Sequence, residues 1–432
     1  MNLIFSETNN ISFDYPTTKN ANALVLGGSG SGKTFHYTKL NIEQISKDAS
    51  FVVVDPMQGE LLSDTKKSLL QKGYTIKILD LRKMPSESED TYNPLSYLHG
   101  DADVFYLASC LVSTGECYKD ECFIAAKTAL LSALIGFIWK YGREFGYSVN
   151  FNGMMELLRN YELNQLFAKV EKDHEKSFAV NQYKKFSKLS KETQEAVKTS
   201  MIEQFPDEIL ECTKTDKLGL EFLRERKTAI FVIIPMEHDK FNFLGQTLCA
   251  QTLYLSTNSG YPSNKDFWVN VFLEEFPNMG LIPEFVNILA VAKKYKVSIS
   301  CYLQSIHQLG AMYGSLSAAI CENFDNILYM GGACTQTMRF ISEKGRIPLT
   351  KVQDLPAEEC ILITHNRVFI SPKANCVNKE RSSNLYIISA DTYSDSCGAE
   401  IYVLACSILS SWQLPKQKSC LKRMVMYAPL TR

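Results

Sequence analysis

Short apolar runs alternate with helical stretches along residues 23–94 and again along residues 228–330, and each run is closed by a polar or turn-forming residue. β-branched and aromatic residues dominate these runs, which predict strands buried on both faces of a parallel sheet. The strands are predicted at residues 23–26, 51–54, 74–79, 228–235, 267–273, 297–303 and 326–330. Helices are predicted at residues 35–46 and 242–257, and another is predicted to follow the turn at residues 55–61 and to end at residue 71. This alternation predicts an α/β fold with a mostly parallel sheet and right-handed crossovers.

The pattern changes between the two sheet-like regions. No proline occurs from residue 95 to 205, and residues 154–205 contain no glycine either. Residues 123–139 are apolar enough for a buried helix, whereas 156–172 and 182–198 are amphipathic and predict helices with charged faces. We therefore expect an all-helical domain at 101–218, inserted between sheet-domain parts at 1–100 and 219–373. The alternative is a set of long crossover helices. Residues 374–432 are unassigned, with strand-like pieces at 385–390 and 401–407.

Composition narrows the class of protein. A chain of 432 residues with 45% hydrophobic and 22% charged content can form two or three globular domains. Its formal net charge of −1 requires any nucleic-acid contact to come from a local basic surface. Thirteen cysteines without a C-x-x-C pair indicate reduced thiols, and argue against a disulfide framework or a zinc site. Residues 1–22 lack the order of a signal peptide, and the apolar windows 128–139 and 401–412 are shorter than the ~20 residues that span a bilayer. A cytoplasmic location is expected.

A glycine-rich run follows the first predicted strand and precedes a predicted helix. Its residues are Gly27, Gly28, Ser29, Gly30, Ser31, Gly32, Lys33 and Thr34. Glycines let the backbone wrap a polyphosphate with N–H groups pointing inward at a helix start. This context predicts a phosphate loop that binds ATP, with Lys33 on the β- and γ-phosphates and the Thr34 hydroxyl on Mg²⁺. The alternative is a flexible Gly/Ser linker.

Two adjacent carboxylates, Glu274 and Glu275, end the predicted strand at 267–273. Downstream of a phosphate loop, such a pair predicts a metal-side acid (Glu274) and a base that polarises the attacking water (Glu275). Alone, the pair would indicate a solvated turn. Gln304 ends the next strand, where its amide would orient that water or sense the γ-phosphate, unless it is a simple cap. Arg339 and Arg346 lie further on and are candidate arginine fingers or ordinary surface residues.

Several motifs in fixed order resemble one family. They are the glycine-rich run at 27–34, Asp55-Pro56 with Gly59-Glu60-Leu61, Asn93-Pro94-Leu95, Phe272 to Phe276, Leu303-Gln304-Ser305 with Gln308-Leu309, Tyr313-Gly314, Asn323 to Gly332, Thr337 and Ile341-Ser342. The set resembles the type IV secretion coupling proteins, the TraG/TraD-like conjugal transfer ATPases, particularly those of Gram-positive conjugative elements. The resemblance covers residues 22–370.

The resemblance implies a RecA-like P-loop NTPase domain that carries an inserted all-helical domain. It also implies a homo-hexameric ring that uses ATP and Mg²⁺ to move single-stranded DNA, with its bound relaxase, toward secretion channel proteins. By position, Lys33 and Thr34 take the phosphate-loop roles, Glu275 the base and Gln304 the sensor.

The chain departs from this family pattern in four places. The family usually has an N-terminal membrane anchor, whereas this sequence starts just upstream of the first strand, so we expect a cytoplasmic fragment, a truncated copy or a member without an anchor, with any membrane contact through a missing anchor or another subunit. Glu274 stands where aspartate is usual, and one extra methylene would shift the metal-side carboxylate. The Asp-Pro turn has an extra residue and lacks the usual lysine. The segment at Gly345 and Arg346 is shorter than in relatives, just where a subunit-facing segment would lie.

These departures leave other functions open. One alternative is a nucleotide-binding adaptor that recruits substrate proteins and hydrolyses ATP weakly or not at all. Another is a different DNA pump of the same broad class, similar to FtsK or HerA. The cognate relaxase, the DNA and the oligomeric state in solution do not follow from the sequence.

Overall fold

The computed structural model describes residues 2–13, 20–56, 58–82, 90–113, 121–160, 162–234, 241–258, 267–365 and 367–375. All of them belong to the unit Met1–Tyr386. The strand-like pieces predicted at 385–390 and 401–407 lie outside the described residues.

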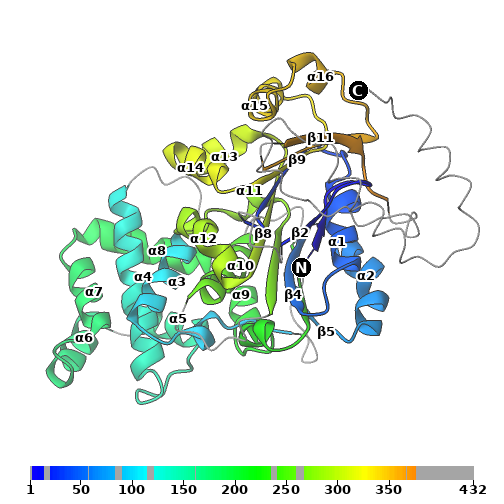
Figure 1. Cartoon of the computed structure of the whole chain (residues 1–432). Coiled ribbons are helices and arrows are strands. Elements are labelled where there is room, and N and C mark those ends of the chain that lie inside the picture. The colour runs from blue at the N-terminus through cyan, green and yellow to red at the C-terminus, as the bar shows by residue number, and fades with distance from the viewer. Residues whose placement is uncertain are drawn as a thin grey trace, which may run out of the picture. The chain divides into compact units, whose positions relative to one another are not determined.

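A nine-stranded sheet organises this part of the chain (Figure 1). Its spatial order is β11-β10-β9-β3-β8-β7-β4-β6-β5. The strands from β9 to β5 are parallel, and β10 and β11 are added antiparallel at one edge. The strand bounds are β3 Ala23–Leu26, β4 Ala49–Asp55, β5 Thr75–Asp80, β6 Thr228–Ile233, β7 Trp268–Leu273, β8 Val297–Leu303, β9 Asn326–Tyr329, β10 Glu359–Thr364 and β11 Arg367–Pro372.

The seven parallel strands lie where the apolar runs predicted them. The antiparallel pair β10–β11 was not predicted, and neither was the two-stranded sheet of β1 (Asn2–Ile4) and β2 (Asn10–Ser12). Both pairs are antiparallel, whereas the prediction considered only alternating strands and helices.

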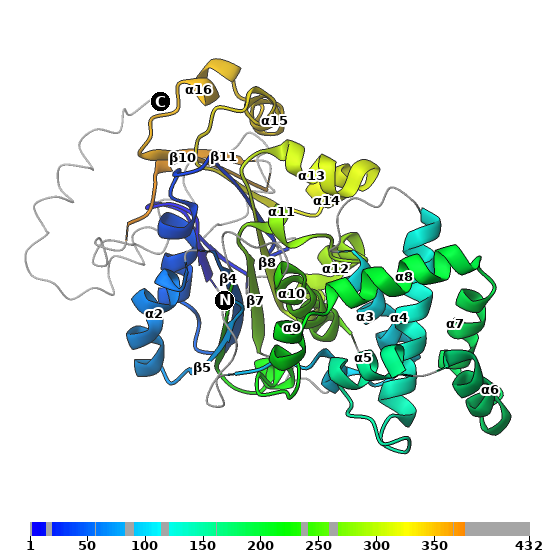
Figure 2. The same ribbon diagram turned by 180° about the vertical axis from the view of Figure 1, so that it is seen from behind.

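Alternation of side chains along the strands builds two cores, one on each face of the sheet. Leu24 and Leu26 of β3 point to the face that packs against α10 (Asn242–Thr257) and the helices between β5 and β6. Ala23 and Val25 point to the opposite face, against the helix that follows the glycine-rich run and α2 (Glu60–Gln71). Figures 1 and 2 show α2 and α10 on opposite sides of the sheet. All four side chains are fully buried, as expected for a parallel sheet covered on both faces.

Two further groups of helices complete the sheet region. On the α2 face, a π-helical segment, Thr34–Lys39, runs into α1 (Leu40–Glu43). The helices that follow β7, β8 and β9 are α11 Phe276–Met279, α12 Phe285–Val291, a 3₁₀ turn Ala292–Tyr295, α13 Ile306–Tyr313, a 3₁₀ turn Gly314–Leu316, α14 Ser317–Glu322, α15 Thr335–Gly345 and α16 Leu349–Gln353.

Only helices and turns occur among the described residues between β5 and β6. They are the 3₁₀ turn Pro94–Tyr97, α3 Asp101–Val112, α4 Glu121–Tyr141, α5 Phe151–Asn160, α6 Leu163–Asp173, α7 Phe178–Ser187, α8 Lys191–Gln204, α9 Asp207–Cys212 and the 3₁₀ turn Leu220–Arg224. These helices occupy the range predicted for the inserted all-helical domain. The domain boundaries at 100, 218 and 373 stay a prediction.

Two helix predictions in this range are wrong. The single helix predicted at 156–172 is broken between α5 and α6, where Glu162 adopts a ψ of 87° outside the helical range. The single helix predicted at 182–198 is broken between α7 and α8. Here the Ser190 side chain accepts a hydrogen bond from the Thr193 N–H and so begins a new helix.

The apolar helix predicted at 123–139 is α4, which is longer at 21 residues. By length and composition it is the one helix of the described residues that would suffice to cross a membrane. Its most apolar window is 67% buried inside the protein, against α3 and α7 among others. That environment is the one expected of a core helix in a folded domain.

The Asn93-Pro94-Leu95 motif joins the sheet region to these helices. The Asn93 side chain accepts from the Leu95 N–H at 3.1 Å and donates to the Val149 carbonyl at 2.8 Å. Gln251 of α10 donates to the Pro94 carbonyl at 3.0 Å. The motif therefore acts as a buried connector between α10 and the start of α5.

Candidate active site

The glycine-rich run forms a loop at the carboxyl end of β3. The Gly27 N–H donates to the Leu303 carbonyl at 3.1 Å and the Gly28 N–H to the Gly331 carbonyl at 2.9 Å. These bonds fasten the loop to the ends of β8 and β9, the two neighbours of β3. Gly30 and Gly32 have φ values of 72° and 84°, in the left-handed region that favours glycine. The glycines are thus required by the shape of the loop.

Lys33 lies inside this loop. Its Nζ donates to the Gly27 carbonyl at 2.7 Å and to the Gly28 carbonyl at 3.0 Å. Burial lowers the pKa of Lys33, and the nearby Glu275 and Glu274 carboxyls act in the opposite direction. An ammonium has three donors. Since two are used within the loop, one remains for an incoming anion.

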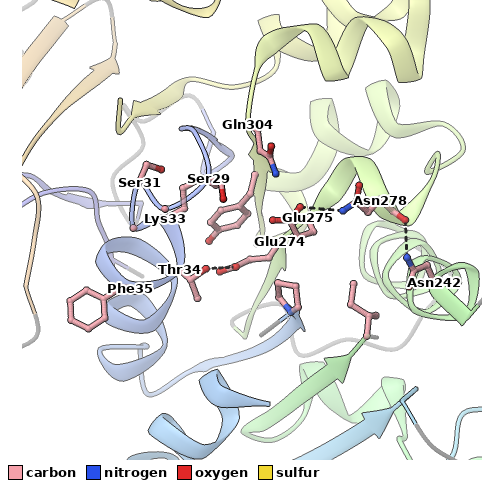
Figure 3. A pocket seen from close by; sticks show the side chains of 15 residues that line it. Ser29, Ser31, Lys33, Thr34, Phe35, Asn242, Glu274, Glu275, Asn278 and Gln304 are labelled. Atoms are coloured by element: carbon pink, nitrogen blue, oxygen red, sulfur yellow. Dashed lines mark hydrogen bonds between the residues drawn. The ribbon is translucent and has the colours of Figure 1, made fainter. Parts of the chain in front are cut away.

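Three strand ends meet beside the loop. β8 lies between β3 and β7, so the loop after β3, Gln304 after β8 and the carboxylates after β7 share one edge of the sheet. Ligands of open α/β sheets bind at this carboxyl edge. Here the structure has a cavity of about 550 Å³ (Figure 3). It is lined by Ser29, Gly30, Ser31, Gly32, Lys33, Thr34, Phe35, Pro56, Ile234, Asn242, Glu274, Glu275, Asn278, Tyr302 and Gln304.

Glu274 connects the carboxyl end of β7 to the helix after the loop. Its Oε2 accepts from the Thr34 hydroxyl at 2.5 Å and its Oε1 from the Thr38 hydroxyl at 2.5 Å. The Thr38 hydroxyl is also 2.7 Å from the Tyr302 hydroxyl. Burial raises the pKa of Glu274 to about 7, while the hydrogen bonds from the two threonines oppose this rise. The Thr34 and Glu274 oxygens lie together, and oxygens are the ligands that Mg²⁺ takes.

Glu275 adopts a left-handed backbone conformation, with φ of 50°, at the start of α11. A non-glycine residue in this region stores strain, which is common at functional sites. Asn278 Nδ2 donates to Glu275 Oε2 at 3.3 Å, and Asn242 Nδ2 donates to the Asn278 carbonyl at 3.2 Å (Figure 3). The half-buried Glu275 side chain therefore faces the cavity beside Glu274 and accepts a hydrogen bond from Asn278.

Gln304 is exposed at the wall of the cavity. Its backbone N–H donates to Gln308 Oε1 at 2.7 Å, and Gln308 also forms a capping box with Ser305 at the start of α13. The backbone is thus fixed by Gln308, which leaves the Gln304 amide directed at the cavity. This arrangement suits a group that contacts a bound ligand.

The two candidate arginine fingers do not line this cavity. Arg339 lies on α15 and Arg346 caps its carboxyl end, and both are exposed. In their own chain they do not meet the loop, so a contact with nucleotide would require a neighbouring subunit. Their role stays a prediction.

Sequence reasoning missed several residues of the site, among them Thr38, Phe35, Tyr302 and Asn278. Thr38 is one helical turn after Thr34, and this i, i+4 spacing on a helix after the loop is the signal that could have indicated it. Asn278 lies one turn after Glu275 in the same way. Phe35, which is 46% exposed at the cavity, carried no local signal.

Comparison with known proteins gives one family and one fold. The family model for type IV secretory system conjugative DNA transfer matches residues 6–345. The chain is similar to the unbound bacterial conjugative coupling protein TrwBdeltaN70, with a TM-score of 0.66 and 15% identity over 84% of this chain and 88% of that chain.

Two ligand-bound structures are similar as well. They are plasmid coupling protein TrwB with the non-hydrolysable ATP analogue ADPNP (TM-score 0.64, 15% identity, 82% of this chain and 87% of that chain) and TrwB with ADP and Mg²⁺ (TM-score 0.65, 15% identity, 85% and 87%). No match was found among curated proteins.

At this level of identity the solved structures establish the fold. The predicted fold class, a RecA-like P-loop NTPase with a mostly parallel sheet, is confirmed. The family model spans well over half of the chain and includes the phosphate loop, Glu274, Glu275 and Gln304. The protein therefore belongs to the type IV secretory system conjugative DNA transfer family, as its motifs predicted.

Proposed function

We propose that this protein is a coupling ATPase of conjugative transfer, which hydrolyses ATP to deliver relaxase-bound single-stranded DNA to a secretion channel. One observation supports the proposal above the others. Lys33 of the phosphate loop lines the same cavity as Glu274 and Glu275. The Thr34 hydroxyl donates a hydrogen bond to Glu274 at 2.5 Å, although these two residues are 240 positions apart in the sequence.

The loop is suited to hold a polyphosphate. Its backbone N–H groups precede a helix, where the partial positive charge of the helix start favours anions. Lys33 adds a full positive charge with one donor still available. TrwB is similar in fold and has been solved with ADPNP, which supports ATP as the ligand of this site.

Thr34 and Glu274 would hold Mg²⁺. The described residues contain no group of three or more His, Cys, Asp or Glu side chains that could hold a metal ion, and nucleotide-bound Mg²⁺ needs none, since phosphates and waters complete its shell. Once bound, Mg²⁺ would neutralise charge on the β- and γ-phosphate oxygens. TrwB, which is similar in fold, was solved with ADP and Mg²⁺, and this supports Mg²⁺ as a cofactor of the site.

We assign to Glu275 the role of acting on the attacking water. Its carboxylate borders the cavity, and Asn278 restricts its orientation through one hydrogen bond. A carboxylate here would accept a proton from the attacking water, and the Gln304 amide, which lines the same cavity after the neighbouring strand β8, would orient that water. Both roles require the γ-phosphate to lie between Lys33 and Glu275.

Motor action requires more than one subunit. We propose a homo-hexamer in which Arg346 or Arg339 reaches the nucleotide of a neighbouring subunit and stabilises charge in the transition state. DNA would be held in a central channel through sequence-independent phosphate contacts, which weaken as salt rises. The protein would work in the cytoplasm at the membrane, with secretion channel proteins and the relaxase as partners.

ATP hydrolysis with and without single-stranded DNA tests this function. We expect DNA-stimulated hydrolysis in the wild type, and a loss of at least about 100-fold in Lys33→Ala and in Glu275→Gln. Glu275→Gln should still bind ATP, since the loop is untouched. Equal hydrolysis in the wild type and both variants would refute the site.

A nucleotide-binding adaptor with weak hydrolysis is a second candidate. It is favoured by the contacts of Glu274, both of whose carboxyl oxygens are engaged by threonine hydroxyls at 2.5 Å. Tight ATP binding without turnover, unchanged by DNA, would establish the adaptor in place of the motor.

A further inference from the structure

The segment that follows β11 lies against the phosphate loop. Lys373 Nζ donates to the Ser31 carbonyl at 3.0 Å, although the two residues are 342 positions apart. The next residue, Ala374, accepts at its carbonyl from His36 Nδ1, with a separation of 2.8 Å. Two consecutive residues of this segment thus contact the loop and the first turn of the helix after it.

Lys373 is an unusual residue for such a contact. Its side chain is only 7% exposed, and no ion pair to it occurs among the residues that the structure describes. Burial lowers the pKa of Lys373, while Cys360 and Glu358 act in the opposite direction. A buried cation is costly unless polar partners offset its desolvation. Here the partner is a carbonyl of the loop that is proposed to hold a polyphosphate.

The orientation of that carbonyl gives the contact a consequence. The Ser31 carbonyl and the Gly32 N–H belong to one planar trans peptide, in which the two groups point in opposite directions. Lys373 holds the carbonyl, so the Gly32 N–H points away from Lys373. A positive charge on the carbonyl also polarises the peptide and makes its N–H a stronger donor.

Packing around Gly32 leaves little freedom for this peptide. A Cβ added at Gly32 would lie 2.4 Å from Cδ2 of His36. His36 is in turn bonded to Ala374, so the position of the imidazole depends on the same segment. The Ser31 hydroxyl is buried and has no hydrogen-bond partner within the described part of the chain, as expected of a group that awaits a ligand.

We propose that Lys373 is a positioning residue of the nucleotide site, which holds the Ser31–Gly32 peptide so that its N–H meets the polyphosphate. This inference rests on the proposed function of the loop. Lys373 lies beyond residues 6–345, which the family model matches, so the feature is additional to what the family match describes. The ligand class is a nucleoside di- or triphosphate.

Equilibrium binding of a fluorescent ATP analogue and of ADP to the full chain tests the proposal. Lys373→Met removes the charge and keeps the length of the side chain. We expect both nucleotides to bind about tenfold more weakly, which corresponds to about 1.4 kcal/mol. Lys351→Met is the matched control, since Lys351 is an exposed lysine on α16 outside the cavity, and it should bind as the wild type does.

A second variant covers the case in which Lys373→Met does not fold. Lys373→Gln keeps a donor to the Ser31 carbonyl without the charge, and we expect about threefold weaker binding, because a neutral donor polarises the peptide less. Circular dichroism before each titration establishes that the folded protein is measured.

The outcomes separate this inference from the proposed function. A lower melting temperature with unchanged affinity of the folded variants would mean that Lys373 only supports the fold, and would overturn the inference. Absence of ATP binding in the wild type, or binding that Lys33→Ala does not reduce, would instead overturn the proposed function.

Discussion

Thr38 provides a quantitative test of how the site is held together. Its hydroxyl donates to Glu274 Oε1 at 2.5 Å and lies 2.7 Å from the Tyr302 hydroxyl. The three side chains are buried, with exposures of 0%, 4% and 2% for Thr38, Glu274 and Tyr302. Thr38→Val keeps the shape and volume of the side chain and removes only the hydroxyl, so no cavity is created.

The expected cost follows from these contacts. Above pH 7, where the Glu274 carboxyl is ionised, a hydrogen bond to this charged group contributes about 1.5–3 kcal/mol, and the buried Tyr302 hydroxyl left without its partner costs about 1 kcal/mol more. We therefore expect Thr38→Val to lower the free energy of unfolding by about 3 kcal/mol. Threonine and valine are both β-branched, so helix propensity contributes little to the difference.

Thr65 supplies the matched control. It is also buried on a helix on the same face of the sheet, but its hydroxyl donates only to the Leu61 carbonyl of its own helix, at 2.8 Å. Thr65→Val should therefore cost about 1 kcal/mol or less. Urea unfolding of the wild type and both variants gives the loss of unfolding free energy in each variant, provided that the dependence of this free energy on urea concentration has the same slope in all three proteins. Equal losses in Thr38→Val and Thr65→Val would refute the claim that Thr38 supports Glu274 inside the protein.

Two further predictions concern the helices between β5 and β6. Lys127 is buried, donates to Ser200 Oγ at 3.0 Å, and has its pKa lowered by burial to about 8. The unfolded chain therefore binds the Lys127 proton more tightly than the folded protein does. For this reason the free energy of unfolding rises as the pH increases from about 8 to about 10.5. Lys127→Met should raise the melting temperature at pH 7 and remove this pH dependence. Asn93→Ala removes the hydrogen bonds of the Asn93 side chain to Leu95 and Val149 and should lower the free energy of unfolding by about 2 kcal/mol. The affinity for ATP should stay the same. A change in this affinity would contradict the assignment of Asn93 as a structural connector.

Local patterns predicted the parts of the fold that depend on local physics. The parallel strands are continuous apolar runs, because both of their faces are buried, and β3 and β8 lie at the predicted residues 23–26 and 297–303. α10 also has its predicted bounds. β10 carries the apolar run Cys360–Ile363, so a strand signal was present, but the antiparallel turn back into β11 was not considered.

Contacts between distant residues could not be predicted in this way. The amphipathic pattern continues through the breaks after α5 and α7, so the spacing of apolar residues alone did not reveal them. A single capping residue such as Ser190 can start a new helix without changing this spacing. The phosphate loop and Glu274 have local motifs. Thr38 and Lys373 do not, because they reach partners 236 and 342 residues away, and only the folded sheet brings these together.

The central claim is that a triphosphate is held between Lys33 and Glu275 within one cavity. A crystal structure of the protein with a non-hydrolysable ATP analogue and Mg²⁺ tests it most directly. The γ-phosphate is expected within hydrogen-bond distance of Lys33 Nζ, with Mg²⁺ on the Thr34 side and Glu275 facing the phosphorus. An analogue bound elsewhere, or an empty cavity at saturating analogue, would contradict the claim.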